Sequence, residues 1–541
     1  MKKRIIYLSS FILIILGVGI FIDQALFKPT EINSFIATKV YSSPANKAFN
    51  DDNFYKCVVN AYNEKNNTSL PYTTNLSDEQ LKTITSLNCV GTGTNEKIES
   101  TNGLEKLTAL NYLHVDDNQL TEIDISKNIQ LLSLSLSKNQ LTNLDVSNNI
   151  SLTILQADNN QLVDINLNDA IALKRLDIYN NKLTSLDVSK NTALTVLNAY
   201  RNQLTNLDVS GATALTDLDV GDNQLTSLDV SKNTILKELT VYENKLTSLD
   251  VNNNTTLTKL HAQNNQLTNL DVSGATALTE LYAQNNQLIN LDVSGATALT
   301  NLDVGDNQLT NLDVSGATAL TDLNVGDNQL TSLDISKNTA LRFLDVGGNK
   351  LTSIDVSKNI VLTELRVDSN QLTSLDVSKN TALARLWVVS NQLTSLDVSK
   401  NTALTQLYAY GNQLTSLDVS NNAALTLLWV SSNQLTSLDV SKNTTLRVLD
   451  VAGNKLTSID VSKNIVLTEL YANGNQLTSL DVSKNIVLTK LYANGNKLTS
   501  LDVSKNTALT YLSVSSNQFA AKLVTYKGNI NIENDNRLVK L

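Results

Sequence analysis

The chain has 541 residues with 42 basic and 52 acidic side chains, and its net charge of −10 excludes the basic excess with which nucleic-acid-binding proteins hold phosphates. Hydrophobic residues make up 41% of the chain, which excludes global disorder. A chain this long would ordinarily hold about three or four domains, but only three prolines, one methionine and two histidines occur among recurring Leu, Asn, Thr, Ser and Asp, which indicates repetition and argues against a multidomain enzyme.

The amino terminus, residues 1–27, is expected to be an export signal. Lys2, Lys3 and Arg4 precede an uncharged apolar run over residues 5–22. At about 1.5 Å per residue this run spans roughly 27 Å, which is short for a membrane helix and long for a cleaved signal peptide. Both fates stay open, and an anchor is slightly favoured because no small-residue cleavage site directly follows Ile22. In either case the positive-inside rule places the rest of the chain outside the membrane, beginning with a linker over residues 28–48.

Residues 49–89 are predicted to form a small helical cap and a first strand. The segment from Asp51 to Tyr62 carries its apolar residues on one helical stripe. A second helix is expected to begin at Ser77, because Gln80 lies three residues later in a capping-box arrangement.

The cap also holds the two cysteines of the chain. Cys57 lies on the apolar stripe of the first helix, and Cys89 follows Leu87 and Asn88 with the alternation of a strand, at the inward position that Val115 takes in the next coil. One disulfide bond and two separate buried thiols are both open, since exported proteins keep disulfides and free cysteine is often buried.

Residues 90–517 are predicted to be one continuous repeat array with a period of 21 residues. Asparagine recurs at every twenty-first position from Asn118 to Asn517, twenty times in all. Counted from this asparagine as position 1, the consensus is N-Q-L-T-S-L-D-V-S-K-N-T-A-L-T-x-L-x-V-x-x. The segment L-x-x-L-x-V-x-x-N-x-L has the spacing of a leucine-rich repeat. The fold class is therefore expected to be a solenoid with a curved parallel sheet of about 20 coils.

Each coil is expected to contribute one short strand and an extended or 3₁₀ convex side, because too few residues remain for a helix. Positions 17 and 19 should point inward, whereas positions 16, 18 and 20 should face the concave side. The position-1 asparagine should donate to and accept from backbone groups that the turn leaves unpaired. The repeated Asp at position 7 and Lys at position 10 are interpreted as a solvated convex face. Beyond the array, residues 518–541 are expected to form a closing hairpin around Lys527 and Gly528.

The export signal, the helical cap and the repeat L-T-S-L-D-V-S-K-N-T-A-L-T together resemble the bacterial internalin family, and within it the internalin J type with its 21-residue repeats. The resemblance covers about residues 49–517. It implies a surface protein that binds host receptors or mediates adhesion. One feature departs from that type: its inward cysteine ladder is replaced here by residues such as Val220 and Ala262 at position 19.

The concave positions vary most, so we expect any binding function to lie there. Both tryptophans and both histidines of the chain occupy position 18. The later coils form an aromatic zone that we predict to bind the ligand, with neighbouring apolar residues: Trp387, Val389, Tyr408, Tyr410, Leu427, Trp429, Tyr471, Tyr492 and Tyr511. Such residues anchor protein interfaces and stack on sugar rings. The alternative is a cross-strand ladder that only stabilises the sheet.

The middle coils form an acidic zone made of Asp217, Asp219, Asp222, Asp303, Asp306, Asp322, Asp327 and Asp345. A solvated face that aids solubility is the simplest interpretation, and steering of a basic partner is the functional alternative. Calcium is a weaker option, because the glycine-rich nonapeptide that binds it is absent.

The sequence does not indicate an enzyme, a cofactor or a metal site. His114 and His261 lie seven coils apart, about 34 Å at the spacing of neighbouring strands. The motifs G-x-S-x-G and H-E-x-x-H do not occur. We therefore expect an exported bacterial protein, secreted or anchored by its N-terminal apolar segment. Its concave face would bind a protein or a carbohydrate on a host or neighbouring cell. The alternative is a structural surface protein without a specific ligand.

Overall fold

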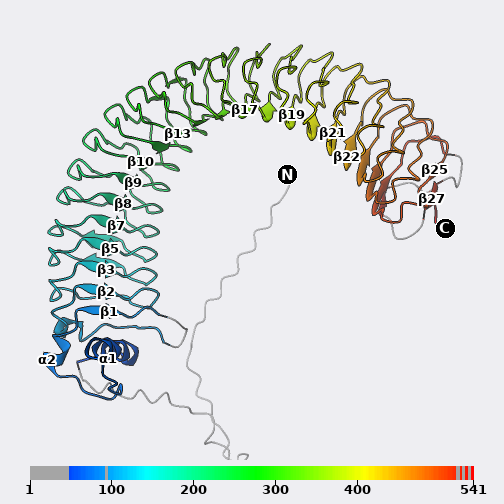
Figure 1. Ribbon diagram of the computed structural model, residues 1–541. Helices are drawn as coiled ribbons and strands as arrows, with labels where there is room; N and C mark the ends of the chain where they lie inside the picture. Colours follow the sequence, from blue (N-terminus) through cyan, green and yellow to red (C-terminus); the bar gives the residue numbers. More distant parts are fainter. Residues whose placement is uncertain (1–47, 92–95, 520–523, 527–530, 534–537, 541) are drawn as a thin grey trace, which may run out of the picture.

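The computed structural model describes residues 48–91, 96–519, 524–526, 531–533 and 538–540. Figure 1 shows one long arch of stacked coils, with a helical cap at the amino-terminal end and the strands along the inner side. The proposed signal, residues 1–27, and almost all of the linker lie outside the described residues. Within the described part, no helix is long and apolar enough to cross a membrane.

The inner side is one parallel sheet of 22 strands. Neighbouring strands pair in register, so that equivalent repeat positions lie side by side, as Leu386 and Leu407 do. This confirms a leucine-rich-repeat solenoid with 21-residue spacing. The strands of this sheet are β1 (Ser86–Asn88), β2 (Tyr112–His114), β3 (Ser133–Ser135), β5 (Ile154–Gln156), β7 (Arg175–Asp177), β8 (Val196–Asn198), β9 (Asp217–Asp219), β10 (Glu238–Thr240), β11 (Lys259–His261), β13 (Glu280–Tyr282), β15 (Asn301–Asp303), β16 (Asp322–Asn324), β17 (Phe343–Asp345), β18 (Glu364–Arg366), β19 (Arg385–Trp387), β20 (Gln406–Tyr408), β21 (Leu427–Trp429), β22 (Val448–Asp450), β23 (Glu469–Tyr471), β24 (Lys490–Tyr492), β26 (Tyr511–Ser513) and β28 (Asn531–Glu533).

The rest of each coil is turns and short extended pieces. Two successive turns follow the position-8 valine, as in the bonds from Asn191 N to Val188 O and from Leu194 N to Asn191 O, each 3.0 Å. Some coils pair a second time at positions 5 to 7, through β4 (Asn143–Asp145) with β6 (Asp164–Asn166) and β12 (Asn269–Asp271) with β14 (Asn290–Asp292). Little helix is present, as the repeat length predicts. A 3₁₀ helix, η2 (Leu104–Lys106), precedes the first complete coil.

Stacked apolar side chains fill the space between the sheet and the turns. Leucines at positions 3, 14 and 17 and the apolar residues at positions 8 and 19 are almost fully buried, as Leu309, Leu320 and Val325 illustrate. Each leucine or valine side chain contributes about 1.5–3 kcal/mol of transfer free energy when it is fully buried. Because a coil buries this surface only against its neighbours, the two ends of the stack need covers.

The position-1 asparagines pair backbone groups, as expected, and they also join consecutive coils. Asn307 donates through Nδ2 to the carbonyl oxygens of Ala283, Val304 and Gly305 at 3.0–3.1 Å. Its Oδ1 accepts the backbone N–H of Leu288 at 2.9 Å. Side-chain amides thus pair backbone groups that would otherwise be buried without partners.

A second asparagine ladder at position 11 was not recognised from the sequence. Asn338, fully buried, donates through Nδ2 to the carbonyl oxygens of Val314 and Ala317 at 2.9 and 2.8 Å. Its Oδ1 has no hydrogen-bond partner among the described residues. Five coils carry alanine instead, and in four of them glycine precedes that alanine, as Gly316 precedes Ala317.

The coils leave the sheet through a left-handed residue at position 21. Examples are Asp306 with φ 54° and Gly348 with φ 63°, and the same position is also occupied by Lys138, Arg201 and Glu243. A positive φ there turns the chain away from the sheet, and asparagine, aspartate and glycine adopt it at least cost.

The amino-terminal cap consists of α1 (Asp52–Asn66) and α2 (Asp78–Leu81), as predicted in kind and approximate position. Asp51 caps α1 by accepting the N–H groups of Asn53 and Phe54, and its other oxygen accepts that of Glu99 in the array. Ser77 and Gln80 form the predicted capping box of α2.

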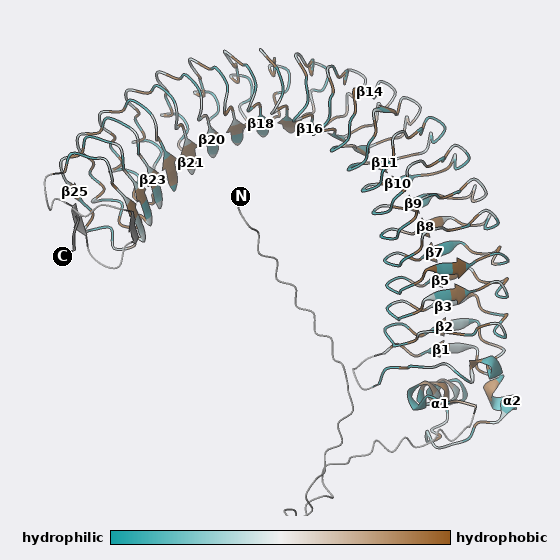
Figure 2. Ribbon diagram, turned by 180° about the vertical axis from the view of Figure 1, so that it is seen from behind, coloured by the Kyte–Doolittle hydropathy of each residue, from teal (hydrophilic) through white to brown (hydrophobic). Residues whose placement is uncertain are grey.

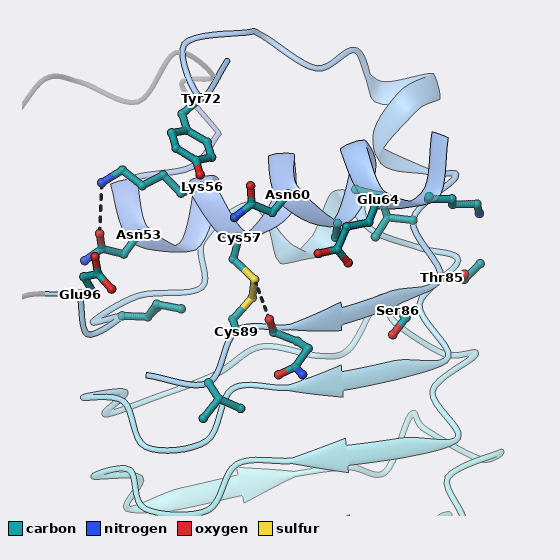
Figure 3. Close-up of a pocket in the computed structure, with 16 residues that line it drawn as sticks. Asn53, Lys56, Cys57, Asn60, Glu64, Tyr72, Thr85, Ser86, Cys89 and Glu96 are labelled. Carbon is teal, nitrogen blue, oxygen red and sulfur yellow. Dashed lines mark hydrogen bonds between the residues drawn. A yellow bond between two sulfur atoms is a disulfide. The ribbon is translucent and has the colours of Figure 1, made fainter. Parts of the chain in front are cut away.

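A disulfide bond joins Cys57 of α1 to Cys89, which settles the alternative left open by the sequence (Figure 3). Cys89 follows β1 in register with Val115, because Leu87 pairs with Leu113. The bond therefore fastens the helical cap to the first strand of the sheet.

The predicted closing hairpin is wrong. β27 (Val524–Tyr526) pairs in parallel with β25 (Leu501–Asp502) and β29 (Leu538–Lys540), and β28 pairs in parallel with β26. A hairpin requires antiparallel neighbours. Alternating apolar residues occur in both arrangements, and here the described strands extend the parallel pairing of the coils.

Candidate functional site

The concave surface is built from three outward positions of each coil: positions 16 and 18 lie in the strand, and position 20 follows it. Figure 2 shows hydrophilic residues on the inner strands around β10 and β11 and hydrophobic residues around β21. Because the strands pair in register, side chains at one repeat position form a column across the sheet.

The first aromatic cluster comprises Trp387, Tyr408 and Trp429 on three successive strands. The Trp387 and Tyr408 rings stack at 4.8 Å with an interplanar angle of 8°, and Tyr408 meets Trp429 edge-on at 5.2 Å. All three rings are half-buried rather than fully exposed, and so is Leu427. Tyr410 packs against Trp429 at 6.2 Å, whereas Val389 is only 6% exposed.

The remaining tyrosines of the predicted zone form a separate cluster. Tyr471, Tyr492 and Tyr511 stack at 4.7 Å between successive ring centroids. Asp450 of β22 occupies the column between Trp429 and Tyr471. The aromatic zone is therefore two clusters, one centred on β20 and the other on β24.

The acidic zone is likewise divided. Asp217, Asp219 and Asp222 belong to the coil of β9, whereas Asp303, Asp306, Asp322, Asp327 and Asp345 belong to the coils of β15 to β17. Strands β10, β11 and β13 separate the two groups. In this gap the ammonium group of Lys259 lies 3.5 Å from the carboxylate of Glu238 and 4.0 Å from that of Glu280.

Burial raises the pKa of three of these carboxyl groups, those of Asp219, Asp303 and Asp345. The largest shift takes the pKa of Asp345 to about 6, with repulsion from Asp368 and Asp327 adding to burial. In each case the N–H of the glycine two residues later donates to the carboxylate, at 2.9 Å for Gly347 and Asp345, and partly offsets the shift. Ionising these three carboxyl groups in the folded protein therefore costs more free energy than ionising an exposed aspartate.

An arginine–carboxylate cluster, not predicted from the sequence, lies between the acidic and aromatic residues. The Glu364 side chain is only 6% exposed and pairs with both Arg366, at 2.8 Å, and Arg385. The Arg366 guanidinium lies 4.6 Å from the ring centroid of Trp387 and 3.7 Å from the carboxylate of Asp345. In the sequence, this cluster was indicated only by Arg366, a charged residue that occupies position 18 one coil before Trp387.

A hollow of about 440 Å³ lies at this junction. Gly305, Gly326 and Gly347 line it, and these three successive coils lack a side chain at position 20. Trp387 and Tyr410 also line it. The predicted acidic and aromatic residues thus meet here, whereas the β9 group and the later tyrosines lie elsewhere.

A larger hollow, of about 740 Å³, lies between α1 and β1 (Figure 3). Its lining is mixed in charge, with Lys56 and Lys65 beside Glu64 and Glu96, and it contains the disulfide. It has no aromatic stack comparable with that of β19 to β21, and only Tyr72 of its lining is aromatic.

A column of tyrosines in the first half of the array also escaped the sequence analysis. Tyr179 and Tyr200 stack at 5.9 Å, and Tyr200 lies 6.4 Å from Tyr242. Their position, 20, could have revealed them, since it carries tyrosine again at Tyr410.

The histidines lie on different parts of the sheet. His114 belongs to β2 and His261 to β11, where it meets Tyr282 edge-on at 4.9 Å. Burial lowers the pKa of His261. Among the described residues, no group of three metal-ligating side chains is placed to hold an ion.

Comparisons with known proteins agree with this fold. A model described as "Leucine Rich repeat" matches residues 442–463, and no curated protein sequence matches the chain. The structure of YopM from Yersinia enterocolitica is 25% identical, with 90% of this chain and 99% of that chain covered and a TM-score of 0.63. The leucine-rich-repeat ectodomain of the membrane receptor kinase GASSHO1/SCHENGEN3 from Arabidopsis thaliana is 20% identical, with 85% and 72% covered and a TM-score of 0.59. InlJ from Listeria monocytogenes is 28% identical over 90% and 82% of the two chains, with a TM-score of 0.37.

Proposed function

We propose that this chain is an exported bacterial leucine-rich-repeat protein, secreted or surface-anchored, that binds a macromolecular partner through its concave face. Its role would be adhesion or interaction with a host. The observation that carries the proposal is the aromatic cluster of Trp387, Tyr408 and Trp429, which an extended sheet holds on its open inner face.

Large aromatic side chains with part of their surface open to solvent are the residue types that anchor interfaces. The strands fix these rings before a partner arrives, so little conformational entropy remains to be lost on binding. The neighbouring carboxylates of β15 to β17 would increase the association rate of a basic partner. The receptor ectodomain from Arabidopsis, which shares this fold, was solved in complex with CASPARIAN STRIP INTEGRITY FACTOR 2, and this supports binding by such a solenoid.

Export rests on the sequence alone, since the charged and apolar segment of residues 1–27 has the pattern of an export signal. The disulfide between Cys57 and Cys89 is consistent with an oxidising compartment. We propose no catalytic activity and no cofactor.

The rival function is a structural surface protein whose rings only stabilise the sheet. The observation in its favour is the mutual stacking of the rings, which leaves each half-buried. A triple substitution separates the two: Trp387→Ala, Tyr408→Ala and Trp429→Ala. Its control removes the same number of rings from the same face through Tyr179→Ala, Tyr200→Ala and Tyr242→Ala.

Both variants and the unaltered chain are incubated with arrays of purified host-surface proteins and glycans, and circular dichroism verifies the fold. We expect the unaltered chain and the control to bind the same partner, and the first variant to lose that binding. If the first variant keeps full binding, the aromatic cluster is not the anchor and the proposal is wrong.

A further inference from the structure

We propose that the hollow between β15 and β19 receives a basic side chain, lysine or arginine, from a protein partner, so that the ligand of the concave face is a basic polypeptide segment. This inference rests on the proposed function and names the partner class of the same surface. It starts from how the hollow is lined.

Carboxylates line the hollow along four successive coils. A Cβ atom placed on Gly347 would lie 3.1 Å from Oδ1 of Asp368 and 3.2 Å from Oδ1 of Asp345. Asp327 and Asp306 line the same space at position 21 of the two preceding coils. Two carboxylates, those of Asp345 and Asp368, therefore flank the space at Gly347, and two more line the hollow on the preceding coils.

The positive charge within the lining does not neutralise them. Arg366 is the only cationic residue among the described residues that line the hollow. Its guanidinium pairs most closely with Glu364, at 2.8 Å, and lies farther from Asp345, at 3.7 Å. Charge complementarity thus favours a cationic occupant.

Arg366 also shows how a cation fits at this junction. Its guanidinium lies between the Asp345 carboxylate and the indole of Trp387, in ion-pair and cation–π contact with the two. A ligand side chain entering from the concave side would meet the carboxylates of the lining, with Val389 and Tyr410 beside its apolar stem.

The stacking argues against a glycan anchored on this tryptophan. β18 and β20 flank β19 on opposite sides, so the guanidinium of Arg366 covers one face of Trp387 and the ring of Tyr408 covers the other. A sugar ring needs a free aromatic face. The ring edges and the carboxylates that remain accessible suit a polypeptide.

The two tryptophans of the full chain, Trp387 and Trp429, report on this region by intrinsic fluorescence. The full chain is titrated with a tetra-arginine peptide, and with a tetra-glutamate peptide and cellohexaose as comparisons. We expect a saturable change in tryptophan emission with tetra-arginine alone, and a weaker affinity at higher salt.

Two variants with the same change in charge locate the binding. The first carries Asp327→Asn, Asp345→Asn and Asp368→Asn; the second carries Asp217→Asn, Asp219→Asn and Asp222→Asn outside the hollow. We expect the first to weaken peptide binding about tenfold or more and the second less than about threefold. Gly326→Val fills the hollow without changing charge, with a side chain that Val389 already places at this position, and should also weaken binding.

No saturable change with tetra-arginine, equal weakening by the two triple variants, or a response to cellohexaose alone would each overturn the inference. The proposed function is tested separately, by the binding of the aromatic variant to its array partner. If tetra-arginine fails but the Trp387, Tyr408 and Trp429 variant still loses its array partner, only the basic-segment inference falls. If that variant keeps its array partner, the proposed function falls whatever the peptide does.

Discussion

The two asparagine ladders should differ in their contribution to stability, although both are buried and both consist of the same residue. Asn307→Ala removes three donated hydrogen bonds and the acceptor of the Leu288 N–H. Leu288 is fully buried, so its N–H cannot pair with water instead. Leaving such a donor unsatisfied costs about 1–3 kcal/mol.

At position 11 the matched change is Lys337→Gly with Asn338→Ala. It removes two donated bonds and also the buried Oδ1 that lacks a partner within the described array. The resulting Gly-Ala pair already occurs in four coils, including Gly316 and Ala317. In that coil the Ser294 carbonyl oxygen lies 2.4 Å from where a Cβ of Gly316 would be, so glycine lets the coils approach. We expect a cost below about 1 kcal/mol.

Hydrogen–deuterium exchange is the suitable assay, because coils of a solenoid open locally and global unfolding need not be two-state. Peptides covering residues 283–309 should exchange about fivefold faster or more in Asn307→Ala, whereas those around residue 338 should change less in the double variant. Equal effects, or a larger effect at position 11, would refute the reasoning that the unpaired backbone N–H determines the cost.

Three further changes follow from the structure. Asp345→Asn should stabilise the chain at pH 7 by about 1–2 kcal/mol in urea unfolding, since a folded pKa near 6 against an ordinary value of 3.8 penalises the ionised form. An amide can still accept the Gly347 N–H, as Asn324 accepts that of Gly326 at 3.0 Å. Because the folded carboxyl group takes up its proton near pH 6 and the unfolded one only near pH 4, the gain should fade as the pH falls from 7 to 4, and a gain that does not depend on pH would contradict this origin. Cys57→Ser with Cys89→Ser opens a link of 32 residues and should destabilise the cap by about 3–4 kcal/mol, seen as faster exchange in α1 but not in the middle coils. On the convex face, hydrogen bonds from serines two residues later lower the pKa of position-7 aspartates such as Asp397 and Asp439, so thermal stability should be retained above pH 4 and lost as the pH falls below it; a melting temperature that stays constant from pH 4 to pH 2 would exclude this contribution.

The sequence predicts the array well because one strong signal, the 21-residue period, determines many contacts at once. It indicates which leucines point inward, that the position-1 asparagine pairs backbone groups left by the turn, and that Cys89 lies in register with Val115. Ser77 and Gln80 are equally local, since a capping box involves only four residues.

What the sequence does not predict depends on contacts between coils or on the path of the chain. The alternation around Lys527 and Gly528 fits both a hairpin and further coils, so the parallel pairing of β27 and β28 could not be inferred from it. The left-handed position 21 is obscured by Lys138, Arg201 and Glu243.

The candidate site shows the same limit. A column of residues at one repeat position can be written from the sequence, but the approach of Arg366 to both Trp387 and Asp345 depends on side-chain conformations. The hollow depends on glycine at position 20 in each of three successive coils, and the effect of these glycines appears only when the coils are stacked.

Binding of the Trp387→Ala, Tyr408→Ala and Trp429→Ala variant is the most direct test of a concave-face binding function. Its affinity for the partner found on the arrays is measured beside that of the unaltered chain and of the Tyr179, Tyr200 and Tyr242 control. We expect a loss of about 2 kcal/mol or more, roughly thirtyfold, in the first variant alone, with its circular dichroism spectrum unchanged. An unchanged affinity together with a lower melting temperature would show that the rings serve only as a stabilising ladder.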